Sequence, residues 1–115
     1  MTDTDGAIVG RLDDGGLMAR YETNDRVVDV QFDRLVVTDV TLRLYRDERE
    51  VGSVYNDHGT AQTMFRAGGQ EGSDFVGVEL PKSFVDRVLT EAEELGITES
   101  ESGTSPDLYR RRVLD

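Results

Sequence analysis

Apolar and polar side chains alternate along much of the first 80 residues of the chain. In the segment 17–22, for example, Leu17, Ala19 and Tyr21 fall on one face, and the residues between them fall on the other. A period of two is typical of β-strands that bury one face. Together with similar short segments, it predicts about seven strands, at 7–12, 17–22, 26–32, 35–46, 51–56, 60–67 and 75–80.

Short polar segments rich in Gly, Asn and Asp separate these strands. Such residues adopt the backbone conformations and local hydrogen bonds of tight turns. A turn centred on Asp47 and Glu48 would place Leu44 opposite Val51. The regular spacing predicts an antiparallel β-meander that curls into a barrel or a small sandwich.

The apolar period changes to that of a helix between residues 82 and 95. Pro81 suits the first turn, Ser83 with Asp86 resembles a capping box, and Gly96 is a typical helix stop. One continuous stripe joins the apolar side chains Phe84, Val85, Val88, Leu89, Ala92 and Leu95. We therefore predict that this helix packs on the strands as part of the core.

The pattern as a whole predicts a single α+β domain over residues 1–97, in which antiparallel strands predominate. Residues 98–115 are expected to form a polar linker, over 98–104, and a short flexible tail. Ser105 and Pro106 suit the start of a short helix in this tail. So short a helix needs a surface on which to dock.

The charge balance points to an unusual solvent. The chain carries 24 acidic and 13 basic residues, a net charge of −11, and Lys82 is its only lysine. Such a surface repels itself at low ionic strength, whereas in molar salt the Debye length falls to about 3 Å. We interpret the composition as that of a halophile's cytoplasmic protein. An acidic mesophilic protein or a nucleic-acid mimic would share the charge but leave the lysine deficit unexplained.

The sequence holds no strong chemical motif. The absence of cysteine excludes disulfides and thiolate sites. The only histidine, His58, lies in a predicted turn without further residues at metal-ligand spacing. The glycine pairs at 15–16 and 68–69 join strands and do not lead into a helix, as a phosphate loop would. We therefore expect no enzymatic activity, no metal and no cofactor.

Membrane association is not expected either. No apolar run approaches the roughly 20 residues of a membrane helix, and the opening residues "MTDTDG" do not resemble a signal peptide. The expected location is the cytoplasm.

Two groups of arginines are the candidate partner-binding residues. Arg43 lies beside Tyr45 on the longest predicted strand, with Arg46 and Arg49 near its end. Basic groups of this kind contact acidic partners or nucleic acid, although they also offset neighbouring carboxylates. The second group is the run near the C-terminus formed by Arg110, Arg111 and Arg112.

Residues 75–97 resemble the first half of the ribbon-helix-helix family of DNA-binding repressors. The similar parts are the strand "FVGVEL", the "LP" entry to the helix, the apolar stripe and the "ELGIT" exit. The resemblance implies a dimer whose paired strands read the major groove. However, this strand offers Gly77 and Glu79 on one face and Val76 and Val78 on the other, so it has no Arg, Lys, Asn or Gln to pair with bases. Nucleic acid is thus a disfavoured partner.

The hypothesis that best fits the sequence is a non-catalytic interaction or regulatory domain. It would bind a protein partner or itself, as a homodimer joined through β-edges. A ribbon-helix-helix-like DNA-binding regulator is the second hypothesis, and a small-ligand-binding β-barrel is the third.

The charge balance predicts that salt stabilises the fold. The melting temperature, followed by circular dichroism, should be clearly higher in molar KCl than in about 0.1 M KCl, because salt screens the repulsion between carboxylates. Equal melting temperatures in the two solutions would contradict the interpretation as a halophilic protein.

Overall fold

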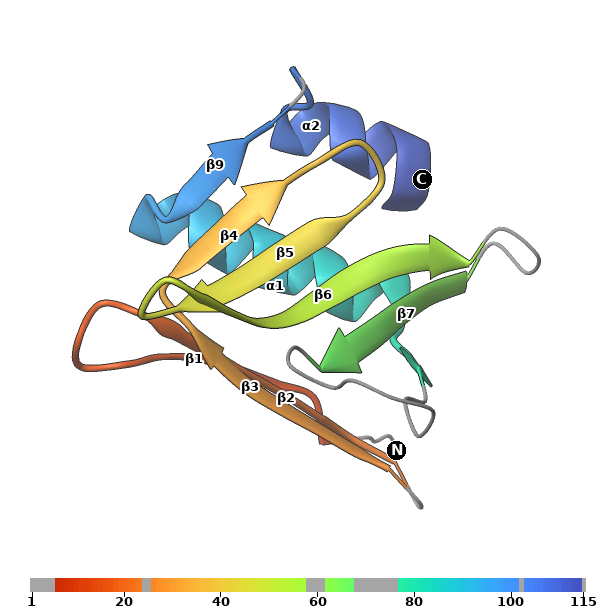
Figure 1. Cartoon of the computed structure of the whole chain (residues 1–115). Helices are drawn as coiled ribbons and strands as arrows, with labels where there is room; N and C mark the ends of the chain where they lie inside the picture. Colours follow the sequence, from red (N-terminus) through yellow and green to blue (C-terminus); the bar gives the residue numbers. More distant parts are fainter. Residues whose placement is uncertain (1–5, 24–25, 58–61, 68–76, 102, 115) are drawn as a thin grey trace.

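The computed structural model describes residues 6–23, 26–57, 62–67, 77–101 and 103–114 (Figure 1). In these ranges the chain forms two β-sheets, two α-helices and a terminal π-helical turn. The first sheet, sheet A, is antiparallel in the order β1-β2-β3, with β1 at Ile8–Arg11, β2 at Leu17–Glu22 and β3 at Val27–Phe32.

The second sheet, sheet B, has the order β8-β7-β6-β5-β4-β9. All of its pairs are antiparallel except β4 with β9. The mainly antiparallel β-architecture is confirmed, but two separate sheets replace the closed barrel that was one of the expectations. The strands are β4 (Arg34–Val37), β5 (Leu42–Arg46), β6 (Arg49–Asp57), β7 (Gln62–Ala67), β8 (Val78–Glu79) and β9 (Thr98–Ser100).

Helix α1 spans Lys82–Leu95, the range that the apolar period predicts. Pro81 is its N-cap, and no side chain caps this end, so the proposed capping box of Ser83 and Asp86 is wrong. Gly96 ends the helix with a φ of 73°, which glycine adopts without strain.

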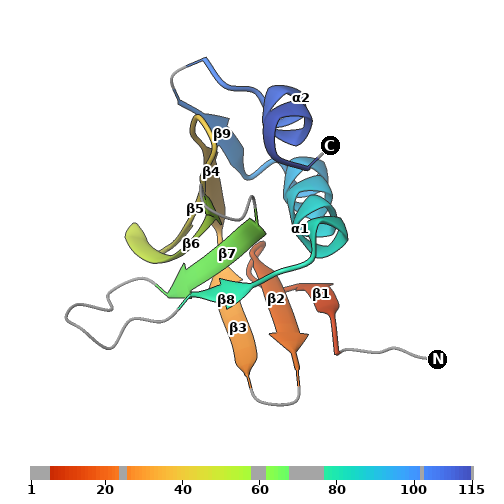
Figure 2. The ribbon, with the colours of Figure 1, turned by 90° about the vertical axis from the view of Figure 1, so that its right-hand side faces the viewer.

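Helix α1 runs from β8 at one edge of sheet B to β9 at the other edge, and its apolar stripe forms the centre of the core. Five of the six stripe residues are buried, while Leu95 is half-buried. Apolar side chains of both sheets and of α1 surround one small cavity of about 20 Å³, which marks where the three layers meet. In Figure 2 the helix lies on one side of β4–β7, and no described helix or strand covers the other side.

The predicted strand at 35–46 is two strands joined by a turn. The turn is closed by the N–H of Thr38, which donates to the carbonyl of Thr41 at 2.9 Å, and the Thr38 hydroxyl donates to the same oxygen at 3.1 Å. Threonine hydroxyls compete for backbone partners in this way and can interrupt a strand. As a result β4 folds back on β5, and Val37 pairs with Leu42.

The hairpin between β5 and β6 turns at Asp47 and Glu48, as predicted, with φ values of 54° and 67°. The expected pairing of Leu44 with Val51 is wrong, because Leu44 pairs with Gly52. The register shifts between Leu44 and Tyr45, where a β-bulge adds one residue to β6.

The segment expected to be a polar linker contains strand β9, which extends sheet B beside β4. Leu35 donates its N–H to the carbonyl of Ile97 at 2.9 Å, and Glu101 donates to Val37 at 2.8 Å. Its three residues Thr98–Ser100 lack an apolar period, because an edge strand can leave its side chains in water.

The tail is not flexible but docked. Helix α2, Pro106–Tyr109, begins at Ser105, whose hydroxyl accepts the N–H of Leu108 at 3.1 Å, and continues as the π-helical turn Arg110–Leu114. Tyr109 has no exposed surface, and burial raises the pKa of its hydroxyl above the ordinary value. The predicted helix start is confirmed, and its docking surface is the domain core. None of the described helices is long and apolar enough to span a membrane.

Candidate functional site

The register of sheet B determines which side chains face away from α1. Residues directly opposite each other on paired strands share one face of a sheet, and the next residue along each strand lies on the other face. Leu42, Val54 and Phe65 pair in one row, and all three are buried in the core. The rows beside this one therefore lie on the outer face of sheet B.

The central outer row crosses five strands. Arg66 of β7 pairs with Ser53 of β6, which pairs with Arg43 of β5; Val36 of β4 and Glu99 of β9 complete the row. Both arginines are exposed. Ser53 and Val36 keep only 8% and 2% of their surface, which indicates that longer side chains of this face lie over them.

The next row holds a stacked arginine. Arg34 pairs with Tyr45, and its guanidinium carbon lies 4.4 Å from the centroid of the Tyr45 ring. The Nε of Arg34 is 3.9 Å from a carboxylate oxygen of Glu99. This places the cation in reach of both an aromatic face and a carboxylate, and so fixes its orientation.

A third row lies toward the β8 edge, where Tyr55 pairs with Met64 and Met64 pairs with Glu79. Tyr55 and Met64 are half-buried. A Cβ atom added to Gly77 would lie 2.5 Å from the Tyr55 hydroxyl, so a larger residue at position 77 would require the Tyr55 side chain to move.

We give the name arginine–tyrosine face to the arginine, tyrosine and methionine side chains that these rows direct outward: Arg34, Arg43, Tyr45, Tyr55, Met64 and Arg66. Arginine, tyrosine and methionine are enriched in the centres of protein interfaces. The same three rows also direct three carboxylates outward, and their negative charges equal the positive charges of the three arginines. The described residues of these three rows thus have no net charge, whereas the chain as a whole has a net charge of −11; the carboxylates are Glu50, Glu79 and Glu99.

The structure separates the four candidates of the β5–β6 hairpin. Arg43 and Tyr45 lie on the arginine–tyrosine face, whereas Arg46 turns to the opposite side and pairs with Asp14 at 2.5 Å. The N–H of Gly16 and the Arg46 guanidinium together lower the pKa of Asp14 below its ordinary value. Arg49 is exposed and lies opposite Arg46 in the strand register, at the end of the hairpin.

Arg110, the first arginine of the C-terminal run, ties the tail to α1. Its Nε donates to Asp86 at 2.7 Å, and its Nη2 donates to Glu93 at 2.6 Å and to the Thr90 hydroxyl at 3.0 Å. Partial burial acts to lower the pKa of Arg110, but the hydrogen bonds to Glu93 and Asp86 outweigh it and raise the pKa above its ordinary value.

The other two arginines of the run differ from each other. Arg112 forms an ion pair with Asp39, in the turn between β4 and β5. Arg111 is exposed, and no ion pair joins it to another described residue. Two of the three arginines therefore hold the tail in place.

Four residues of the arginine–tyrosine face were not candidates from the sequence. The alternation in β6 and β7 already sets Tyr55, Met64 and Arg66 opposite to the buried Val54 and Phe65, so that signal was present. Arg34 carried no such signal, because it falls in a segment that the sequence assigns to a turn.

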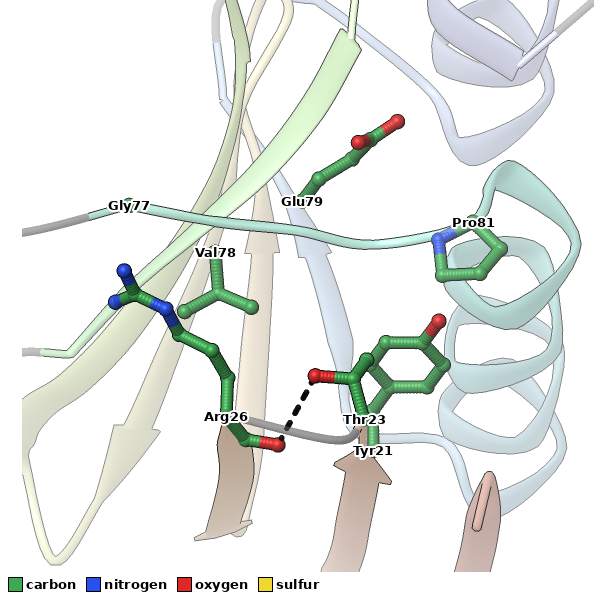
Figure 3. A pocket seen from close by; sticks show the side chains of 7 residues that line it. All are labelled: Tyr21, Thr23, Arg26, Gly77, Val78, Glu79 and Pro81. Atoms are coloured by element: carbon green, nitrogen blue, oxygen red, sulfur yellow. Dashed lines mark hydrogen bonds between the residues drawn. The ribbon is translucent and has the colours of Figure 1, made fainter. Parts of the chain in front are cut away.

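A hollow of about 550 Å³ opens beside the arginine–tyrosine face, between the end of the β2–β3 hairpin and β8 (Figure 3). In Figure 3 the guanidinium of Arg26 points toward Gly77 and Val78, whereas the side chain of Glu79 points the opposite way. The lining residues are Tyr21, Thr23, Arg26, Gly77, Val78, Glu79 and Pro81.

Metal ligation has no support in the described ranges, where no three His, Asp or Glu side chains are grouped to hold an ion. His58, the glycine pair at 68–69 and the strand start at 75–76 lie outside the described residues. The chain matches no protein-family model, no curated protein and no solved structure.

The contacts of Arg110 predict that it stabilises the fold. Arg110→Gln should lower the free energy of unfolding by about 1–3 kcal/mol, because partly buried, charge-assisted hydrogen bonds to α1 are lost. Urea unfolding at fixed molar KCl measures this difference. Arg111→Gln, one residue away and exposed, is the matched control and should change stability by less than about 0.5 kcal/mol. Equal effects of the two substitutions would contradict this role.

Proposed function

We propose that this chain is a non-catalytic protein-interaction domain of regulatory type, built for a salt-rich cytoplasm, and that its contact surface is the arginine–tyrosine face. The observation that carries this proposal is the composition of that face. The sheet presents arginines, tyrosines and a methionine on the side away from α1, while the chain as a whole is strongly acidic.

The chemistry of the face fits a protein partner with exposed carboxylates. In molar salt, charges interact over only about 3 Å, so direct contacts must replace long-range attraction. Arginine suits such contacts, because its planar guanidinium binds a carboxylate through two hydrogen bonds and also stacks on aromatic rings. Arg34 already stacks on Tyr45 in this way.

A second copy of the chain is one such partner, and strand edges offer another way to self-associate. The β1 edge is crossed by side-chain contacts from α1, where Arg11 pairs with Glu91 at 3.2 Å and Arg87 donates to the Ala7 carbonyl at 3.4 Å. The outer edge of β3 pairs with no other strand among the described residues, and Val27, the first residue of β3, is 52% exposed. Pairing of β3 edges is therefore one alternative geometry for a homodimer.

The other two hypotheses find less support. In a ribbon-helix-helix dimer the strand before the helix pairs with the partner's strand, but here β8 pairs with β7 of the same chain. A strand, β9, follows α1 where that family has its second helix. A ligand inside the β-sheets would need some 300 Å³ or more, and the core cavity measures about 20 Å³.

Site-specific cross-linking tests the proposed surface. A photoreactive benzoylphenylalanine in place of Met64 should form a covalent adduct with a protein partner in molar KCl, because Met64 lies within the face. The same group in place of Ile8, an exposed position on the outer face of sheet A, is the control and should form little adduct. Mass spectrometry then shows whether the partner is a second copy.

Charge reversal completes the test. Arg43→Glu should abolish the adduct formed at position 64 while the melting temperature is retained, whereas Arg111→Glu, also exposed, should leave the adduct unchanged. This face would be ruled out as the contact surface if the photoreactive group formed as much adduct at position 8 as at position 64. The same conclusion would follow if Arg43→Glu left the adduct at position 64 unchanged.

A further inference from the structure

The hollow beside β8 has the features of a site for an extended peptide, and three observations carry this inference. The first is the edge of β8 that faces away from β7, which pairs with no other strand among the described residues. Leu80 donates its N–H to the Thr63 carbonyl at 2.8 Å, so in this antiparallel pair the main-chain groups of Leu80 and Val78 point toward β7. The N–H and C=O groups of Gly77 and Glu79 therefore point the other way, away from β7.

The second observation is the direction of the charged side chains. In Figure 3 the Arg26 guanidinium reaches toward Gly77 and Val78, and Glu79 points away from it. Arg26 is thus the charged side chain that the described lining residues direct into the hollow. Its backbone is fixed, because its carbonyl accepts the N–H of Thr23 at 2.8 Å and the Thr23 hydroxyl at 3.4 Å.

The third observation is the apolar wall next to Arg26. The ring of Tyr21 lies in the hollow with its centroid 5.5 Å from that of Phe84, and Pro81 faces it in Figure 3. One cation and one aromatic wall thus lie side by side along the same edge. Side chains of an extended chain that point to one face recur every second residue, so an acidic and an apolar side chain two positions apart would meet them.

We propose that the hollow binds an extended peptide segment whose main chain pairs with the edge of β8 that faces away from β7. One carboxylate side chain of the peptide then contacts Arg26, and one apolar side chain packs against Tyr21. Main-chain pairing with an exposed edge supplies affinity in this recognition mode, and pockets for alternate side chains supply specificity. The site lies outside the arginine–tyrosine face and does not depend on it.

The inference can be tested by nuclear magnetic resonance with the blocked pentapeptide acetyl-TETVT-amide as the probe. Titration of the full-length, nitrogen-15-labelled protein should shift the amide resonances of Gly77 and Glu79 in a saturable manner, because these N–H groups gain hydrogen bonds. The peptide acetyl-TQTVT-amide should bind roughly two- to five-fold more weakly, as expected for the loss of one exposed ion pair. Arg26→Glu should remove the preference for the acidic peptide.

Two controls distinguish peptide binding in the hollow from binding at the arginine–tyrosine face and from a general effect of carboxylate ions. Arg43→Glu, on the arginine–tyrosine face, should leave the titration unchanged, so failure of the proposed function does not affect the result. Sodium acetate at a matched carboxylate concentration should not reproduce the shifts at Gly77 and Glu79. Shifts that do not saturate, or the same shifts with acetate alone, would overturn the inference. It would also be overturned if the unaltered protein bound the two peptides equally, or if Arg26→Glu kept the preference for the acidic peptide.

Discussion

The packing of the α1 stripe across both sheets is the constraint on which the rest of the structure depends. Sheet A and sheet B each have one apolar face, and neither could remain folded with that face in water. Phe84 contacts the ring of Tyr21 from sheet A, while Leu89 and Val85 are buried in the same core as sheet B. One helix therefore holds two sheets together, and Tyr109 of α2 and Val113 of the π-helical turn extend the same core.

This arrangement also determines which side of sheet B faces away from the core. Helix α1 lies on the inner side of sheet B (Figure 2). The strand register places arginine, tyrosine and methionine side chains on the outer side. Arg110 and Arg112 form ion pairs with acidic residues and so hold the tail in place, and Arg46 forms an ion pair with Asp14. Arg34 and Arg43 instead lie within sheet B and face outward, which is why we propose them as contacts for a partner.

The elements with a strong period could be predicted from the sequence, and those fixed by tertiary contacts could not. The α1 stripe repeats over 14 residues, so its bounds were correct. Thr38 and Thr41 alternate like strand residues, and only the hydrogen bonds of the folded chain reveal the turn between them. Arg43 and Tyr45 could be assigned to one face by alternation. The stacking of Arg34 on Tyr45 depends on how β4 folds back on β5, which that hidden turn determines.

Native-state hydrogen exchange in molar KCl tests most directly whether α1 unites the two sheets. The hydrogen-bonded amides of Ala19 in β2, Leu44 in β5 and Leu89 in α1 should all exchange by global unfolding, with opening free energies that agree within about 1 kcal/mol. Such agreement means that neither sheet opens while α1 remains folded. If Ala19 exchanges at an opening free energy several kcal/mol below that of Leu89, sheet A unfolds independently and the account is contradicted.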